Sequence, residues 1–300
     1  MAEPIDDVHR DVARIVLHAI GEHQASSSRF GLAGGNALSA WGLLNRPTED
    51  VDVALGTLDR FAEAVGAAGA ALADSGYAVQ EVDKFSGWEE DDDEVGLAEL
   101  LAVTADGTRE IQVQIGYFDL YASPVAMPGL GPVCGLDDVA GHKTVALANR
   151  MLTRDYVDVA ALRARYETSR LIDLATERDP GLQVADFADA AVRLDRMKDA
   201  QLEEILARTS LTAAWVRQQF ADWPRDAPPR PGPLPHGKGS LPSRRKADRP
   251  PLLATCATAW NRRFPLLIAV RACLVRPLRH DNPCHRSERR TPLPGHYPEH

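Results

Sequence analysis

The 300-residue sequence has few cysteines, few aromatic residues and no long apolar run. Its four cysteines form no Cys-x-x-Cys pair and no regular framework. This excludes a disulfide-rich secreted scaffold and a zinc site built on cysteine pairs, and it fits a reducing compartment. No apolar stretch approaches the ~20 residues that cross a bilayer, and early acidic residues are unlike a signal peptide. We therefore expect a soluble cytoplasmic protein with no membrane partner.

Charge is distributed unevenly along the chain. Residues 225–300 contain 15 Lys and Arg against 5 Asp and Glu, whereas residues 1–224 contain 19 against 38. The front therefore carries a net charge of −19 and the tail +10. The tail is also rich in proline, serine and glycine, so we expect it to be disordered. Two interpretations of it stay open, a basic RNA-binding extension and an unstructured extension without function.

A glycine-rich stretch stands out in the acidic front. The apolar run 30–33 leads into Gly34-Gly35-Asn36, and the helix-compatible segment 37–44 follows. Glycine lets the backbone come close to a phosphate, and the amide groups at the start of a helix point toward such an anion. The pattern predicts a strand, a phosphate-binding turn and a helix.

Paired carboxylates follow this stretch. After a turn at 45–47, a second apolar run over 51–55 contains Asp52, and Asp50 immediately precedes it. Residues i and i+2 of a strand point to one face, where two carboxylates repel each other unless a cation lies between them. Carboxylate oxygens are the ligands that Mg²⁺ prefers. The spacing therefore predicts a metal-binding strand.

Hydrophobic periodicity predicts the other elements of a small mixed α/β domain over residues 1–130. The acidic segment 84–96 is predicted to be a solvated loop, and the Pro/Gly-rich segment 127–135 a connection between domains. The predicted elements are helices over 5–22 and 58–73 and strands over 77–82, 97–103 and 109–115, the last two joined by a turn at 105–107.

Helical spacing prevails after residue 130 and predicts an all-helical domain over 131–224, followed by the tail, 225–300. The run Leu136-Asp137-Asp138 offers an N-cap for the first of its helices, which runs to Arg150, and Thr153 can cap the second, over 154–166. The further predicted helices cover about 168–177, 183–197 and 200–222. The fold class is therefore α/β (α+β), with a small mixed-sheet domain, an all-helical domain and a disordered basic tail.

A second set of charged residues lies in the helical domain. If its first two helices were continuous, Lys143, Arg150 and Arg154 would share one face, with Asp158 on the edge and Asp155 further round. A lysine on an inner face can contact a triphosphate, and an aspartate one turn away can orient it. Taken alone, the pattern is equally that of a surface helix with i, i+4 ion pairs.

Together, the two sets of residues resemble the AbiEii/MenT family of nucleotidyltransferase toxins, within the polymerase-β-like nucleotidyltransferase superfamily. The resemblance covers roughly residues 25–165, with similar helical organisation to 222. The motifs that carry it are Gly34-Gly35-Asn36, Arg46-Pro47-Thr48-Glu49-Asp50-Val51-Asp52, and Lys143 with Arg154-Asp155-Tyr156-Val157-Asp158. Members of this family transfer nucleotides from NTP, in studied cases to the 3′ end of tRNA, and an antitoxin partners them in type IV systems.

The resemblance implies roles for the matching residues. Those expected to bind the nucleotide are Gly34, Gly35, Asn36, Arg46, Thr48 and Lys143, with Arg46 and Thr48 supporting either the phosphates or the neighbouring strand. Those expected to bind Mg²⁺ are Asp50 and Asp52. Those expected to be catalytic are Asp50, Asp52, Lys143 and Asp158, with Asp155 as the alternative to Asp158 for the family's essential downstream carboxylate.

Two departures from the pattern of related enzymes are visible. Many polymerase-β-type enzymes carry a third carboxylate on a later strand, where this chain has Gln112 and Gln114. Glu110 lies at the start of that strand and Asp119 beyond its end, so neither is well placed to bind a metal. In addition, Asn36 stands where Ser or Thr is commoner, although its amide can still donate to a phosphate.

We therefore expect Mg²⁺-dependent nucleotide transfer from an NTP to RNA, with the 3′ end of tRNA as the acceptor and an antitoxin protein as a partner. Because the acidic front repels RNA, a basic face must compensate, and the predicted face comprises Arg150, Arg154, Arg163, Arg165 and Arg170. Two alternatives stay open. One is nucleotide transfer to a small molecule, and the other is a non-catalytic nucleotide-binding module.

Overall fold

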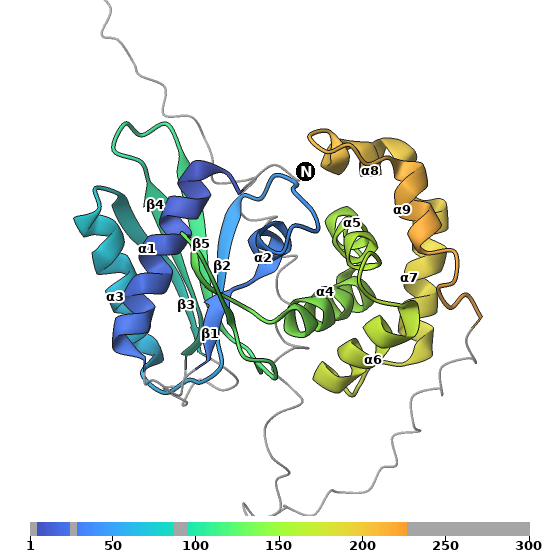
Figure 1. The fold of residues 1–300 in the computed structure, drawn as a ribbon, viewed down its shortest axis with the longest axis horizontal. Coiled ribbons are helices and arrows are strands. Elements are labelled where there is room, and N and C mark those ends of the chain that lie inside the picture. The colour runs from blue at the N-terminus through green and yellow to red at the C-terminus, as the bar shows by residue number, and fades with distance from the viewer. Residues whose placement is uncertain (1–4, 25–28, 87–94, 227–300) are drawn as a thin grey trace, which may run out of the picture. The chain divides into compact units, whose positions relative to one another are not determined.

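The computed structural model describes residues 5–24, 29–86 and 95–226. All of them belong to one compact unit, residues 1–262, within which a mixed sheet carries helices on both sides (Figure 1). The prediction of a disordered tail concerns residues outside the described ranges. No helix in the described ranges has the length and apolarity needed to span a membrane.

The strands form one sheet. Their bounds are β1 Phe30–Leu32, β2 Asp50–Leu55, β3 Ala78–Ser86, β4 Val95–Val103, β5 Glu110–Tyr117, β6 Val125–Met127 and β7 Gly131–Val133. Their order across the described part of the sheet is β3-β4-β5-β2-β1-β7-β6. β2 is central, with β1 antiparallel to it on one side and β5 parallel to it on the other. The sheet is therefore mixed, as the sequence predicts.

The helices form two groups. Those of the sheet region are α1 Asp7–His23, α2 Gly34–Ala40 and α3 Phe61–Asp74. Those that follow the last strand are α4 Leu136–Arg150, α5 Thr153–Leu162, α6 Thr168–Arg178, α7 Val184–Arg196, α8 Asp199–Leu206 and α9 Ala213–Gln219. α1 and α3 cover one face of the sheet, whereas α2 lies on the side that faces α4 and α5 (Figure 1). The predicted order, sheet first and helices second, is confirmed.

Local signals explain where several elements begin and end. The Asp6 carboxylate accepts hydrogen bonds from the backbone N–H groups of Val8 and His9, at 3.1 and 3.4 Å, and so caps α1. The predicted hairpin turn between β4 and β5 is present, with Gly107 at φ 68°. There, the Asp106 carboxylate accepts from the backbone N–H of Thr108 at 3.1 Å.

The central strand alternates between two environments. Val51 and Val53 are buried, and α1 packs on this strand. Asp50 and Asp52 point to the opposite, partly exposed face. The period of two that predicts a shared face for the two carboxylates is therefore realised in the structure.

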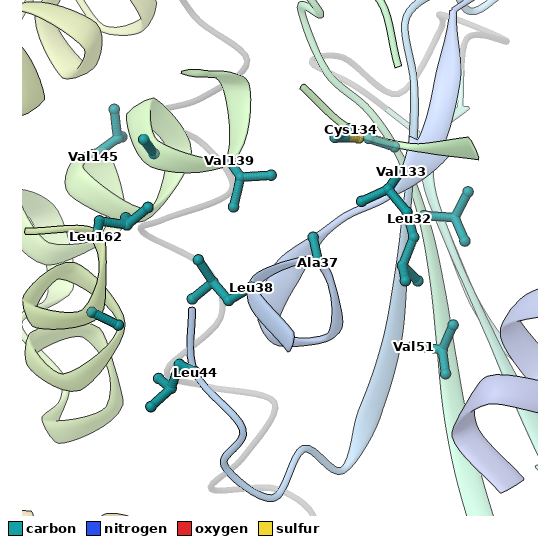
Figure 2. Close-up of a cluster of buried hydrophobic side chains, with 14 of the residues drawn as sticks. Leu32, Ala37, Leu38, Leu44, Val51, Val133, Cys134, Val139, Val145 and Leu162 are labelled. Atoms are coloured by element: carbon teal, nitrogen blue, oxygen red, sulfur yellow. The ribbon is translucent and has the colours of Figure 1, made fainter. Parts of the chain in front are cut away.

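Helix α2 is packed between the sheet and the helices that follow it. Figure 2 shows Ala37 and Leu38 of α2 between Val133 of the sheet and Val139, Val145 and Leu162 of α4 and α5. All these side chains are at most 4% exposed, and they belong to one continuous apolar core. The glycine-rich turn at the start of α2 is thereby fixed relative to both the sheet and the helices.

Several predicted boundaries need correction. The connection 127–135 contains part of β6 and all of β7, because β7 pairs with β1 through distant residues that local patterns do not reveal. β3 and β4 extend into the predicted acidic loop, of which 87–94 lie outside the described residues. The predicted helix 200–222 is two helices, α8 and α9. α5 begins at Thr153, which the sequence predicts as its N-cap, after the capping residue Leu152.

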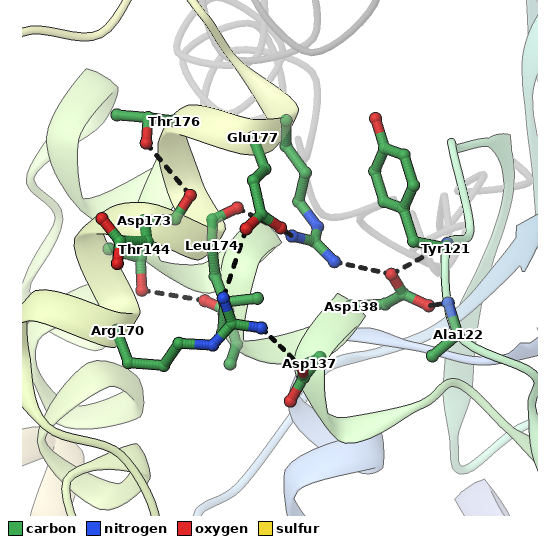
Figure 3. A network of polar contacts seen from close by, with 12 residues as sticks. Tyr121, Ala122, Asp137, Asp138, Thr144, Arg170, Asp173, Leu174, Thr176 and Glu177 are labelled. Atoms are coloured by element: carbon green, nitrogen blue, oxygen red, sulfur yellow. Dashed lines mark hydrogen bonds and ion pairs between the residues drawn. The ribbon is translucent and has the colours of Figure 1, made fainter.

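A buried ion pair fixes α4 to its neighbours. The Arg178 guanidinium of α6 donates to the Asp138 carboxylate at 2.6 Å, and both side chains are at most 2% exposed. Asp138 also accepts from the backbone N–H groups of Tyr121 and Ala122, at 3.1 and 3.0 Å (Figure 3). Gly141 makes room for this arrangement, since a Cβ there would lie 2.5 Å from the Arg178 side chain. The network orients α4, which carries Lys143.

Replacing Asp138 by alanine should lower the free energy of unfolding by about 3–5 kcal/mol, because Arg178 would become a buried, uncompensated charge. Asp137 is a matched control. It is the adjacent carboxylate and also pairs with an arginine, Arg170, but both side chains are nearly half exposed. Asp137→Ala should therefore cost less than about 1 kcal/mol. Urea unfolding followed by tryptophan fluorescence measures both, and equal losses would contradict the assignment.

Candidate active site

Asp50 and Asp52 occupy the partly exposed face of β2. Burial and the neighbouring charge of Asp50 raise the pKa of Asp52 to about 7, and the positive charges of Lys143, Arg154 and Arg150 only partly oppose this shift. The two carboxylates are thus close enough to repel each other, as their spacing predicts. A divalent cation between them would relieve that repulsion, so the residues present fit an oxygen-liganded metal such as Mg²⁺.

The two glycines have a steric role at this site. Gly34 adopts φ 62°, and a Cβ on it would fall 1.6 Å from Oδ2 of Asp52. A Cβ on Gly35 would fall 2.5 Å from Cγ2 of Thr48 and 3.3 Å from Nη2 of Arg46. The backbone of Gly34 and Gly35 therefore packs directly against β2 and the loop that precedes it. Only glycine allows this approach.

Asn36 and Thr48 brace the start of β2. The Asn36 amide donates to the backbone carbonyl of Asp50 at 2.8 Å and accepts from the Thr48 hydroxyl at 3.1 Å. The Asn36 side chain is buried, at 3% exposure. The predicted phosphate-binding role of Gly34, Gly35 and Asn36 stays a prediction, and it falls on their backbone amides because the Asn36 side chain has these internal partners.

Asp158 is held by two cations from different elements. Its Oδ1 accepts from Nε of Arg46 at 2.6 Å, and its Oδ2 accepts from Nη2 of Arg46 at 2.9 Å and from Nζ of Lys143 at 2.7 Å. Burial by itself raises the pKa of Asp158, but the charges and hydrogen bonds of Arg46 and Lys143 outweigh burial and hold that pKa well below its usual range. The predicted residues Arg46, Lys143 and Asp158 are therefore brought together.

Asp155 has a different environment. Its carboxylate forms a bidentate pair with Arg150, with the shortest distance 2.8 Å to Nη2, and accepts from the backbone N–H of Leu152 at 3.0 Å. α4 and α5 are not continuous, since Met151 between them adopts the left-handed φ of 53° and ends α4. Of the two alternative carboxylates, the structure places Asp158 with Arg46 and Lys143, and Asp155 at the junction of the two helices.

Among the described residues, Arg154 is the one cation of this region that has no hydrogen-bond or ion-pair partner. It makes no hydrogen bond or ion pair within the ranges that the structure describes, and its Nε atom is shielded from solvent. Its positive charge lowers the pKa of Asp52, which places it within electrostatic reach of the metal-site strand. The sequence suggests Arg154 only as part of a basic face, because a lone arginine in a helical repeat gives no sign of where it points.

The position of a third carboxylate is occupied by an amide. Gln114 of β5 is the register partner of Asp52, and Gln112 that of Asp50. Glu110 lies one step beyond this row, and Asp119 accepts from the Tyr117 hydroxyl at 2.9 Å beyond the end of β5. Among the described residues, no three His, Cys, Asp or Glu side chains form a group of metal-binding size.

One buried carboxylate near the site was not singled out from the sequence. Glu99 of β4 is the register partner of Gln114, so it lies on the same face of the sheet as Asp52, two strands away. It is only 7% exposed. The sequence could have indicated Glu99, because it is the one charged residue among the apolar residues Leu97, Ala98 and Leu100. Charged residues in such strands are rarely buried without a specific partner or role.

The predicted basic face is largely neutralised. Arg150 pairs with Asp155, Arg163 pairs with Asp222 at 2.9 Å, and Arg170 pairs with Asp137 and Glu177 at 3.0 and 3.2 Å. Each of these arginines carries a carboxylate of the same chain as its counter-charge. The five arginines predicted from the sequence therefore do not form a continuous unpaired surface.

A mixed sheet with paired aspartates on its central strand, a glycine turn packed against them and facing cations define a protein of the nucleotidyltransferase class. The family model for the nucleotidyl transferase AbiEii toxin of type IV toxin–antitoxin systems matches residues 16–229. The chain belongs to this family, which confirms the resemblance seen in its motifs.

Two solved structures illustrate the similarity. JHP933 from Helicobacter pylori is 16% identical, with 72% of this chain and 91% of that chain covered and a TM-score of 0.43. MenT4, a nucleotidyltransferase toxin from Mycobacterium tuberculosis H37Rv, is 17% identical, with 71% and 82% covered and a TM-score of 0.44. A search of curated proteins finds no match.

Asp52→Asn should stabilise the metal-free protein by about 4 kcal/mol at pH 8 and by only about 1.5 kcal/mol at pH 5. The pKa of Asp52 is raised from 3.8 to about 7. Between these values the folded protein keeps a proton that the unfolded chain has released, so this group lowers the free energy of unfolding as pH rises. Asparagine removes the effect. Chemical denaturation at both pH values measures it, with exposed Asp59→Asn as the control. If Asp52→Asn raised the free energy of unfolding equally at both pH values, the ionisation of Asp52 would not be the cause of the stabilisation.

Gly34→Ala should displace Asp52 and abolish divalent-cation binding by the folded protein. Gly42→Ala is a matched control, because Gly42 has a similar φ of 69° but nothing lies within 4 Å of its Cβ position. Backbone strain alone should cost each variant about 1–2 kcal/mol. Only Gly34→Ala should also lose Mn²⁺ binding, measured by titration calorimetry. Retained Mn²⁺ binding in Gly34→Ala would show that the close approach to Asp52 is unimportant.

Proposed function

We propose that this protein is a Mg²⁺-dependent nucleotidyltransferase that transfers a nucleotide from an NTP to RNA, with the 3′ end of tRNA as the acceptor. We propose further that it acts in the cytoplasm as a toxin whose partner is a cognate antitoxin protein. The observation that carries the proposal is the arrangement of charge, in which Asp50 and Asp52 face a group of cations contributed by other elements. Membership of the AbiEii family supports it.

Asp50 and Asp52 would hold the metal ion. Bound there, Mg²⁺ supplies charge neutralisation for the triphosphate and for the oxygens of the reacting phosphorus. Their oxygen donors suit this ion, and the repulsion that raises the pKa of Asp52 would be relieved by it. In this chain no third carboxylate stands beside them on β5, where Gln114 is the register partner of Asp52.

The surrounding charges suit a triphosphate. The four carboxylates Asp50, Asp52, Asp155 and Asp158 are matched by the four cations Arg46, Lys143, Arg150 and Arg154. With a divalent cation added, the group carries a formal charge of about +2, which attracts an anionic nucleotide. Lys143 and the unpaired Arg154 would contact its phosphates.

The remaining work is positioning. Nucleotidyl transfer needs an acceptor hydroxyl in line with the α-phosphorus and stabilisation of developing negative charge, with no covalent intermediate on the protein. Asn36 and Thr48 fix the start of β2, and Gly34 fixes Asp52. These residues would hold the metal ligands still while the acceptor varies.

A small-molecule acceptor is the second candidate, and one observation favours it. Three of the five arginines that were predicted to bind RNA are paired with carboxylates of the chain itself. A small acceptor would not need a basic surface. The two candidates share the same nucleotide site and differ only in what provides the hydroxyl.

Incubation with each α-labelled NTP, Mg²⁺ and total tRNA should place label on tRNA 3′ ends. Asp52→Ala and Lys143→Ala should reduce the rate by about 100-fold or more, since each removes charge stabilisation at the reacting centre. Exposed Asp59→Ala and Lys198→Ala are matched controls and should retain the rate. Expression of the wild type, but not of Asp52→Ala, should arrest bacterial growth.

Different results would separate the candidates. Label on a small-molecule fraction, with none on RNA, would replace the first candidate by the second. NTP binding without any labelled product would overturn enzymatic transfer and leave a nucleotide-binding module. Full activity in the presence of EDTA would contradict the metal requirement.

A further inference from the structure

Asp158 lies at the meeting point of three separate elements. Arg46 comes from the loop before β2, Lys143 from α4, and Asp158 itself from α5. The side chains are 9%, 12% and 0% exposed, respectively. The carboxylate is therefore enclosed, and it is reached by cations from both the sheet region and the helices.

Both oxygens of Asp158 already have partners. Oδ1 and Oδ2 receive the Arg46 guanidinium in a bidentate pair at 2.6 and 2.9 Å, and Oδ2 also receives Nζ of Lys143 at 2.7 Å. Because the Asp158 side chain is fully buried, a substrate hydroxyl or a metal ion could reach it only if its partners moved. Charge-assisted bonds of this geometry are among the strongest in proteins.

The pairing of Arg46 and Lys143 with Asp158 leaves one positive charge without a counter-charge. Two cations face one carboxylate, so Arg46, Lys143 and Asp158 together carry a formal charge of +1. Arg46 also packs over the glycine turn, where its Nη2 is 3.3 Å from the Cβ position of Gly35. The surplus charge is thus held beside the predicted phosphate-binding turn.

We propose that Asp158 is a positioning residue, which clamps Arg46 and Lys143 together so that their surplus positive charge receives the triphosphate of the NTP. The proposal rests on the proposed function, because it assumes that a nucleotide binds here. It differs from the catalytic role that the family resemblance implies for Asp158. In this role Asp158 touches neither substrate nor metal, and it acts through its two partners.

The clamp predicts that Asp158 stabilises the folded protein through its two partners, which a carboxylate free to act on a substrate would not do. If the carboxylate is neutralised by Asp158→Asn, the two cations lose their counter-charge and carry a formal charge of +2. The folded protein should lose stability, with Tm lower by roughly 10 °C. An anion that binds between the cations should now bind more tightly, because it replaces the missing charge.

The probe is inorganic triphosphate, without metal and without RNA, measured by calorimetry and by thermal unfolding. Asp158→Asn should bind it roughly tenfold more tightly than the wild type. Lys143→Met, with a formal charge of zero, should bind it roughly tenfold more weakly. The double variant Lys143→Met with Asp158→Asn has the wild-type charge of +1. It should recover the wild-type affinity within about twofold and regain Tm relative to Asp158→Asn.

Triphosphate binding by folded Asp158→Asn that equals or falls below that of the wild type would overturn the clamp. If Asp158→Asn does not fold, the double variant Lys143→Met with Asp158→Asn tests the clamp instead. Recovery of folding on removal of one cation supports the clamp, and failure of the double variant to fold shows a packing role instead. No nucleotide transfer is needed for these readouts. Wild-type protein that transfers no nucleotide, yet shows this order of affinities, would reject the proposed function and keep the clamp.

Discussion

Two like charges on one short strand are the constraint around which this protein is arranged. Asp50 and Asp52 must lie on the same face of β2, since side chains of a strand alternate, and their repulsion is strong enough to raise the pKa of Asp52 to about 7. Lys143, Arg150 and Arg154, which are distant in sequence from β2, partly offset this repulsion. The folded state therefore carries an unfavourable electrostatic interaction at these two carboxylates, which a divalent cation between them would relieve.

The helices after the sheet supply those cations at fixed places. The buried pair of Asp138 and Arg178 orients α4, and the apolar core that includes Leu38 joins α2 to the same helix. Lys143 is held by this packing as well as by its ion pair with Asp158. Arg154, which has no ion pair among the described residues, is held by the packing of α5. Stability and charge arrangement therefore depend on the same contacts, so a core substitution in α4 or α5 would alter both.

Local features of the site were predictable from the sequence, and distant pairings were not. The glycine pair, the i, i+2 carboxylates and the Gly107 turn each follow from short-range geometry, and the structure contains all three. The pairing of β7 with β1 depends on residues a hundred positions apart, which no local pattern reveals. The sequence places Lys143 near Asp158 only on the condition that the two helices are continuous. In the structure the two side chains form an ion pair although Met151 interrupts the helices.

The backbone contact between Gly34 and Asp52 has a genetic consequence. Every missense change of a glycine codon adds a Cβ, and here any Cβ falls 1.6 Å from a carboxylate oxygen of Asp52. Position 34 therefore has no conservative substitution. In a cell that carries a toxin of this family, single-nucleotide changes at this codon offer a direct route to a folded but inactive protein. Such a protein would still present its surface to an antitoxin.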